Sequence, residues 1–340
     1  MGTALVLVLY AAAVAWCLPA PLARLTARGA SPRFGLAAWL AAMVSVLASL
    51  GAALFFLVRT VAADWPRLSQ AVCQEVAGTA CTPVIYRSAL YEAGLAALLA
   101  IASLAALAGA WRYGRRVRRG HRQTAGHATA VRIVGRALPG AGMPAGDSAA
   151  GRERGGAGTM VLDDPRPAAY CVAGRPPVIV VTRGTLDVLD HAQLEAVLAH
   201  ERAHLSGRHH SLILAARALA AAFPGVPLCD AGAAAVALLA EMRADDAAAR
   251  CAGRPALITA LIAIATATPA GPAAAGSPAE PGIPPGSGAA LAAAAYAVPA
   301  RVERMLHAPD LLRRVASAAA MLAVTLPLLF APPLLAAFAL

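Results

Sequence analysis

Two imidazoles and a carboxylate come together in the motif H-E-x-x-H, which this chain carries as His200-Glu201-Arg202-Ala203-His204. On a helix, a spacing of four residues places His200 and His204 on one face, where they can share one zinc ion. Glu201 can then reach a water molecule on the metal without ligating the metal. Zinc lowers the pKa of such a water from about 15.7 to about 7, and the carboxylate takes the proton as the water attacks a carbonyl carbon. The motif predicts a site for one zinc ion with Glu201 as the base.

A catalytic zinc ion usually has three protein ligands and one open position, and two residues compete for the third place. His210 completes the longer pattern H-E-x-x-H-x-x-G-x-x-H together with Gly207. Glu241 lies in a later helical segment, four residues before Asp245. Two acids at this spacing repel each other unless a cation or a histidine N–H lies nearby. We favour Glu241 as the ligand, with Asp245 as hydrogen-bond partner of a ligand histidine, and keep His210 as the alternative.

The helix that would position the motif is expected to begin at Asp190. Asp190 is a good N-cap, and Gln193 stands where a capping box needs it. Leucine and valine recur at helical spacing through the segment, at positions 194, 197, 198 and 205. A step of about 100° per residue puts Glu201 inside this apolar stripe. A carboxylate that faces a core is costly unless something compensates it, and a bound cation would do so.

The composition is that of a membrane protein. Of 340 residues, 59% are hydrophobic and 14% charged, and the mean hydropathy is +0.64, whereas soluble domains have roughly half and a quarter. This excludes a disordered, fibrous or disulfide-stapled secreted chain. Four segments approach the about 20 apolar residues that a spanning helix needs: 3–18, 35–58, 89–111 and 315–340.

A further apolar block, residues 211–228, is interrupted by Arg217 and by two prolines. We expect it to lie on the membrane or dip into it. His209 and His210 lead directly into this block. We therefore expect His210 at the membrane surface and His209 as an interfacial basic side chain.

The charge pattern predicts the topology. All 29 basic residues are arginines, against 18 acids, for a net charge of +11. Arginines cluster beside the apolar segments, at 19–34 and 111–122, and such loops are usually cytoplasmic. We expect both termini outside and no direct binding of nucleic acid. The loop 59–87 would lie outside; its Cys73 and Cys81 could pair or remain free thiols.

These motifs resemble the membrane-bound gluzincin peptidases, most closely the BlaR/MecR-type family of integral-membrane metallopeptidases. The hallmarks that carry the resemblance are 169–174, 178–189, the H-E-x-x-H helix, Glu241 to Asp245, and 301–306 ahead of the last span. Antibiotic-sensing members carry a penicillin-binding domain after the last span. The sequence ends at Leu340, so we do not expect this domain in it.

The resemblance implies a mainly α membrane protein of about four spans, with a small α+β gluzincin-like domain inserted between spans three and four. We expect five parts: a three-span membrane region (1–119), a cytoplasmic zinc-peptidase domain (120–268), a flexible linker (269–288), a juxtamembrane helix (289–314) and a last span (315–340). The strand 177–182 would be an edge strand that pairs with an extended substrate; an ordinary buried strand is the other interpretation.

By the same resemblance, His200, His204 and Glu241 are zinc ligands, Glu201 is the base and Asp245 supports the site. The implied function is hydrolysis of peptide bonds in a cytoplasmic or membrane-proximal protein, most specifically a repressor of the BlaI/MecI type. Quality control of membrane proteins is the alternative, and a non-catalytic zinc-binding scaffold is a third hypothesis. The expected partners are a protein substrate and the lipid bilayer. The sequence is silent on the oligomeric state.

Overall fold

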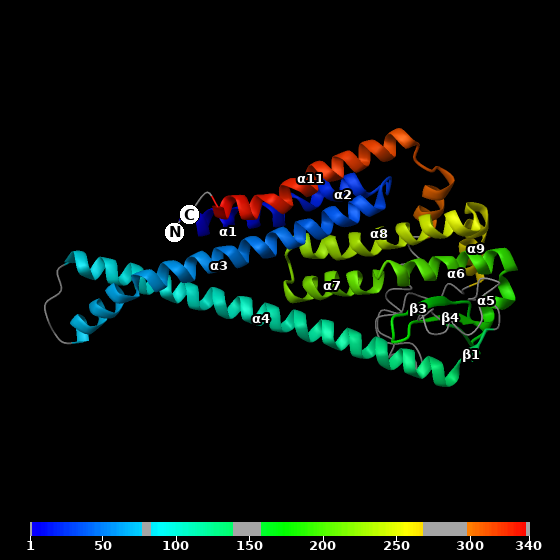
Figure 1. Ribbon diagram of the computed structural model, residues 1–340, viewed down its shortest axis with the longest axis horizontal. Helices are drawn as coiled ribbons and strands as arrows, with labels where there is room; N and C mark the ends of the chain where they lie inside the picture. The colour runs from blue at the N-terminus through cyan, green and yellow to red at the C-terminus, as the bar shows by residue number, and fades with distance from the viewer. Residues whose placement is uncertain (1, 77–82, 139–157, 268–297, 338–340) are drawn as a thin grey trace, which may run out of the picture.

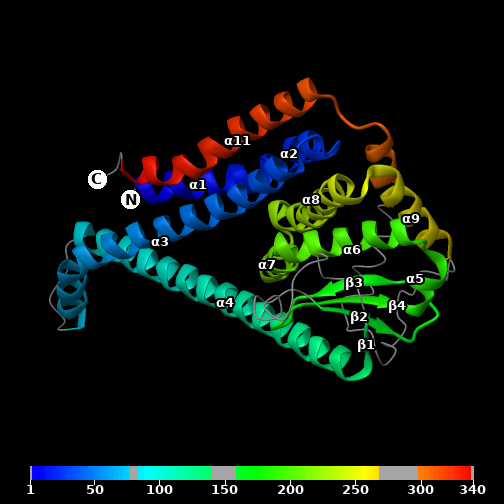
Figure 2. The ribbon, with the colours of Figure 1, turned by 45° about the vertical axis from the view of Figure 1, so that its right-hand side comes forward.

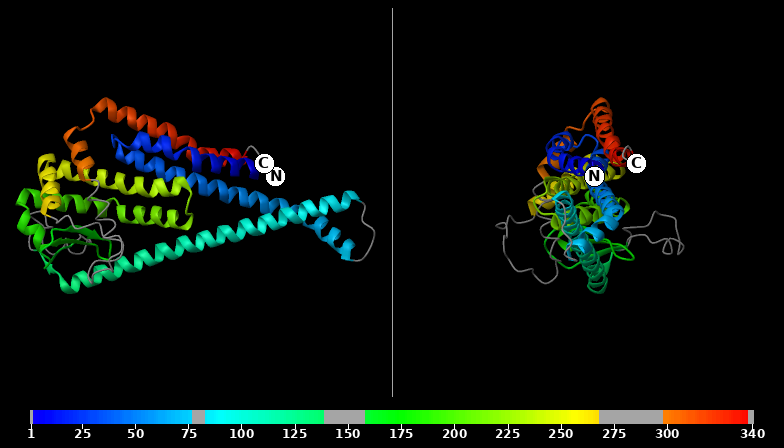
Figure 3. Two further views of the ribbon diagram at one scale, coloured as in Figure 1. Left: turned by 180° about the vertical axis from the view of Figure 1, so that it is seen from behind. Right: turned by 90° about the vertical axis from the view of Figure 1, so that its left-hand side faces the viewer.

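The computed structural model describes residues 2–76, 83–138, 158–267 and 298–337 of a mostly helical, elongated molecule (Figure 1). In chain order its elements are α1 (Gly2–Cys17), α2 (Pro19–Thr26), α3 (Pro32–Val76), α4 (Pro83–Val134), β1 (Arg136–Ala137), β2 (Gly158–Leu162), β3 (Ala169–Val172), β4 (Val178–Thr182), α5 (Arg183–Val188), α6 (His191–Ser206), α7 (His209–Ala222), α8 (Pro227–Ala252), α9 (Arg254–Ala267) and α11 (Leu311–Ala337). Residues 298–306 are also helical and are called the 298–306 helix below. The start of α1 and the end of α11 lie side by side and away from the sheet, and the end of α3 and the start of α4 extend beyond them (Figure 3).

Two described helices are long and apolar enough to cross a membrane: Pro32–Ala63, within α3, and α11. The pair α1 and α2, bent by 45°, passes the same test together, which allows a third span. These candidates correspond to the expected first, second and last spans, although α11 begins at Leu311 rather than at 315. The expected span 89–111 is helical within α4 but is not among the candidates found in the described residues, so four spans remain a prediction.

The span candidates share one apolar core with the hairpin formed by α7 and α8. Trp39 of α3 is fully buried in this core. A Cβ added at Gly232 of α8 would meet Met43 of α3, so the missing side chain lets the two helices approach closely. At the far end of the hairpin, Phe223 packs against Gly109 of α4. The hairpin therefore lies between helices α3 and α4 (Figure 1). That residues 211–228 lie on the membrane or dip into it stays a prediction.

A four-stranded sheet with the order β1-β2-β4-β3 lies beneath α6 (Figure 2). β4 pairs with β2 in parallel and with β3 in antiparallel fashion, and all its residues are buried. The prediction that strand 177–182 forms an edge is therefore wrong. The continuous apolar run Val178-Ile-Val-Val shows no alternation, as expected of a strand covered on both faces. The outer strand beside β4 is β3, which contacts α6.

The remaining expectations concern chain segments outside the membrane helices. The expected linker 269–288 lies outside the described residues, as does Cys81, so the pairing of Cys73 with Cys81 stays open. The expected juxtamembrane helix 289–314 corresponds in its described part to the 298–306 helix, which ends before α11 starts. The five-part division of the chain remains a prediction.

Candidate metal centre

Helix α6 begins with the capping box that the sequence predicts. The Asp190 side chain accepts a hydrogen bond from the Gln193 backbone N–H at 2.8 Å, and the Gln193 side chain accepts one from the Asp190 N–H at 3.0 Å. The cap fixes the first turn of the helix and thereby its orientation over the sheet. Three turns later the motif residues His200, Glu201 and His204 are all buried, at 7%, 8% and 9% exposure. The burial of Glu201 that helical periodicity predicts is confirmed.

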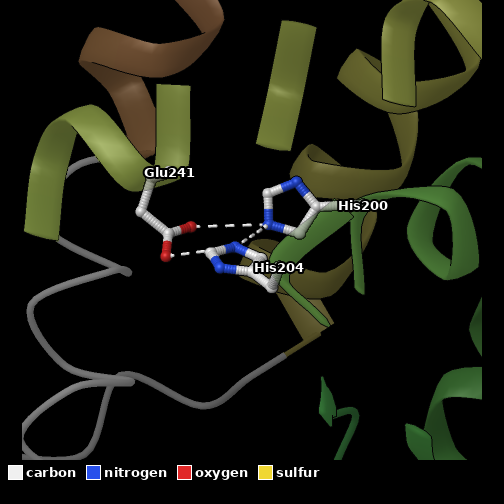
Figure 4. Close-up of side chains that lie close together, drawn as sticks. All are labelled: His200, His204 and Glu241. Atoms are coloured by element: carbon white, nitrogen blue, oxygen red, sulfur yellow. Dashed lines mark hydrogen bonds and ion pairs between the residues drawn. The ribbon is translucent and has the colours of Figure 1, made fainter. Parts of the chain in front are cut away.

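Three side chains from two helices converge on one point (Figure 4). The Nε2 atoms of His200 and His204 lie 3.0 Å apart. Oε2 of Glu241, on α8, lies 3.4 Å from Nε2 of His200, and its Oε1 lies 3.4 Å from Nε2 of His204. Among the described residues, these three are the group whose ligand atoms gather closely enough to hold a metal ion.

The spacing of these atoms fits a tetrahedral zinc ion. Zinc binds imidazole nitrogen and carboxylate oxygen at about 2.0–2.2 Å, so two ligand atoms on a tetrahedron lie about 3.3–3.5 Å apart. The observed separations of 3.0 and 3.4 Å come close to this value. Two imidazoles, one carboxylate and one open corner are the ligand set of a catalytic zinc site.

The charges around the histidines favour a cation. Burial by itself would lower the pKa of His200, but Asp245 and Glu241 outweigh this effect and raise its pKa to about 10. Burial would conversely raise the pKa of Glu241, but the hydrogen bonds from His200 and His204 hold it well below its ordinary value. The site is thus negative around its imidazoles, and a divalent ion would neutralise that charge.

Asp245 stands behind the first histidine. Its Oδ1 lies 3.1 Å from Nδ1 of His200, although that N–H does not point straight at the oxygen. Asp245 is completely buried. Burial would raise its pKa, but the hydrogen bonds from Arg301 and the nearby His200 ring lower it to about 2. The carboxylate is therefore ionised and lies where a partner of a ligand histidine is expected.

Arg301, on the 298–306 helix, supplies the cation that compensates these buried acids. It donates to Asp245 through Nε at 2.8 Å and Nη2 at 2.6 Å, and its Nη1 lies 3.3 Å from Glu241. The 298–306 helix is anchored a second time: Arg304 pairs with Asp246 at 2.6 Å and donates to the Gly29 carbonyl at 3.0 Å. Arg301 was expected only as part of a family hallmark, because the acids that it contacts are more than fifty residues away along the chain.

Cys171 of β3 lies beside Glu201, and no sequence pattern predicts this contact. Burial raises the pKa of its thiol, and the Glu201 carboxylate raises it further. The thiol is therefore protonated and close to the candidate base. β3 therefore borders the site on the side where Cys171 lies.

His209 and His210 occupy different environments. His210 accepts or donates a hydrogen bond with Ser211 at 2.9 Å and does not join the three-residue group. His209 is only 2% exposed, so the expectation of an interfacial basic side chain is wrong. The turn after α6 folds its ring inward, onto His204 at 3.2 Å.

The third ligand can be tested by metal content. Replacing Glu241 by Ala removes the only carboxylate of the close group, so we expect zinc binding to fall at least about tenfold. His210→Ala removes a ring outside that group and should leave the zinc content unchanged. Zinc in the purified variants is measured by mass spectrometry. Loss of zinc in the His210 variant alone would reverse the assignment.

The central part of the chain, which holds the motif, is similar to known proteins. Residues 148–239 match the model of peptidase family M48. The matched M48 segment contains His200, Glu201 and His204, and it ends just before Glu241. This part of the chain is therefore similar to peptidase family M48, and it includes the helix in which the H-E-x-x-H motif predicts a zinc site.

Two relatives are similar over a shorter stretch. A protease HtpX homolog of Dictyoglomus thermophilum is 49% identical over 47 residues, which are 13% of this chain and 16% of that protein. A protease HtpX homolog of Dictyoglomus turgidum is 45% identical over 47 residues, with the same shares. The similarity thus spans about a sixth of each relative's length. No solved structure matches the chain. The M48 match confirms the peptidase expectation, while the narrower BlaR/MecR resemblance stays a prediction.

Proposed function

We propose that this protein is a membrane-bound zinc endopeptidase that cleaves proteins at or near the bilayer surface. The observation that carries the proposal is the convergence of Glu241 from α8 on His200 and His204, which lie on the helix that also holds Glu201. The two Nε2 atoms are 3.0 Å apart, and each has one Glu241 oxygen at 3.4 Å. The M48 match over the same helix supports it independently.

Each side chain has a distinct task in hydrolysis. His200, His204 and Glu241 would hold the zinc ion, and Asp245 would fix the ring of His200. A bound zinc ion acts as a Lewis acid that polarises a carbonyl oxygen and lowers the pKa of water. The Glu201 carboxylate accepts the proton of the attacking water and then delivers it to the leaving amine. Because Glu201 is buried, its carboxylate is largely shielded from bulk water.

The position of α8 favours substrates close to the membrane. Leu239 of α8 belongs to the apolar core that contains the span candidates, and Glu241 follows two residues later on the same helix. The metal centre therefore lies within about one helical turn of that core. A substrate segment that emerges from the bilayer would reach it without crossing much solvent.

The arginine clusters at 19–34 and 111–122 place the peptidase domain on the cytoplasmic side in this proposal, with both termini outside. Reporter fusions after Arg122 and at the C-terminus test this topology. An active cytoplasmic reporter after Arg122 supports it. An active cytoplasmic reporter at the C-terminus contradicts it.

The substrate class separates quality control from the cleavage of a BlaI/MecI-type repressor. The closeness of the site to the membrane core favours misfolded membrane proteins. Co-expression of the full-length protein with such a repressor and, separately, with a destabilised membrane protein distinguishes the two. Degradation of the membrane protein at several positions supports quality control, whereas a single cut in the repressor supports regulation.

The proposal as a whole is tested with the full-length protein in detergent. We expect about one zinc ion per chain and cleavage of an unfolded protein that a chelator stops and added zinc restores. A protein that takes up no zinc, or cleaves equally well without it, would contradict the proposal.

A further inference from the structure

The ring of His209 lies against the second histidine of the motif. Its Nδ1 is 3.2 Å from Nδ1 of His204, and the two rings meet edge to face at 88° with centroids 4.9 Å apart. His209 comes from the first residue of α7, whereas His204 lies in the last turn of α6. This contact is on the side of His204 opposite to Glu241, since Nε2 faces the carboxylate at 3.4 Å.

We propose that His209 is a positioning residue, which holds the ring of His204 so that its Nε2 points at the metal; this inference rests on the proposed function. A histidine that binds a metal through Nε2 keeps its proton on Nδ1. Nδ1 of His204 then donates to Nδ1 of His209, which accepts and carries its own proton on Nε2. A hydrogen bond of this kind fixes both the tautomer and the orientation of a ligand ring.

The two ligand histidines are thus supported by different groups. His200 faces the carboxylate of Asp245, and His204 faces the ring of His209. Glu201, Glu241 and Asp245 already bring three carboxylates to the site, and Arg301 compensates them only in part. A neutral imidazole supports His204 without adding a fourth negative charge.

The turn between α6 and α7 is built to bring this ring inward. A Cβ added at Gly207 would overlap the His209 ring, so only glycine leaves the ring its place. Arg208 adopts a left-handed conformation (φ 49°, ψ 34°), which non-glycine residues rarely take. These two features interrupt the helix between α6 and α7, so that α7 continues in the same general direction (Figure 1) and starts with His209 against the last turn of α6.

Packing alone does not account for a histidine at this position. Nε2 of His209 is buried and has no hydrogen-bond partner within the described part of the chain. A buried N–H without a partner is destabilising, and a leucine would fill a similar volume without this penalty. The imidazole is explained by the one bond that it does make, to His204.

The test compares three variants of the full-length protein in detergent. His209→Leu keeps the bulk and removes the acceptor, so we expect zinc affinity to fall about 10–100-fold and the visible spectrum of the cobalt-substituted protein to change. His209→Asn keeps an oxygen near the place of Nδ1 and should retain most of the affinity. His210→Leu is the matched control, because the adjacent ring bonds Ser211 and not His204; it should behave like the wild type.

The outcomes separate this inference from the proposed function. Wild-type zinc affinity and an unchanged cobalt spectrum in His209→Leu would overturn the role of His209 alone. If His209→Leu does not fold, His209→Asn decides: retained affinity supports the inference, and a loss of affinity in a folded protein overturns it. A wild-type protein that binds no zinc would overturn both the inference and the proposed function.

Discussion

Replacing Glu201 by Gln is expected to lower peptide hydrolysis roughly 10²–10⁴-fold while zinc remains bound, since general acid–base catalysis contributes about that factor. The amide has the size of the carboxylate but cannot take a proton from water. The proposed zinc ligands His200, His204 and Glu241 do not include Glu201, so zinc content should not change. Cleavage rate and zinc content are measured on the same preparation.

The matched control for this variant is Glu195→Gln on the same helix. Glu195 is a half-buried acid whose carboxylate lies 3.7 Å from Arg202 and which is outside the close group, so its loss tests the general effect of removing one carboxylate from α6. It should leave hydrolysis unchanged. Equal activity of Glu201→Gln and the wild type would remove Glu201 as the base and favour the non-catalytic zinc scaffold.

Replacing Arg301 by Met should have the largest effect on stability. Arg301 is 3% exposed and Asp245 is fully buried, so loss of the guanidinium leaves buried carboxylates without their cation. Breaking one side of a buried ion pair typically costs about 3–5 kcal/mol. Because Glu241 is also within 3.3 Å of Arg301, zinc binding should weaken as well. Thermal unfolding and zinc content in detergent provide the measurements.

Two further variants show whether the buried charge is the cause. Arg202→Met breaks an exposed pair with Glu195 and should change stability by no more than about 1 kcal/mol. Adding Asp245→Asn to Arg301→Met removes the unpaired charge, so part of the lost stability should return. If Arg301→Met melts like the wild type, the buried ion pair does not hold the centre together.

The sequence predicted those features that depend on residues close to one another along the chain. The capping box at Asp190, the burial of Glu201 and the apolar run of β4 all follow from spacing along one segment. The role of Glu241 could also be predicted from the sequence. Two acids one helical turn apart, Glu241 and Asp245, need a cation nearby.

What the sequence did not predict depends on contacts between distant segments or on rare backbone geometry. Arg301 reaches Asp245 across 56 residues, and no periodicity connects the two. The inward position of His209 depends on the left-handed conformation of Arg208, which residue type alone does not indicate. β4 was assigned to an edge because strand order in a sheet depends on all strands together.

The anchoring of the 298–306 helix has a practical consequence for work on this protein. Arg301 and Arg304 tie the helix both to α8 and to the turn before α3, so the catalytic half cannot be excised as an independent fragment. A fragment ending at residue 268 would contain all three proposed ligands yet leave Asp245 buried beside no counter-ion. A fragment truncated in this way should therefore fold poorly and fail to retain metal.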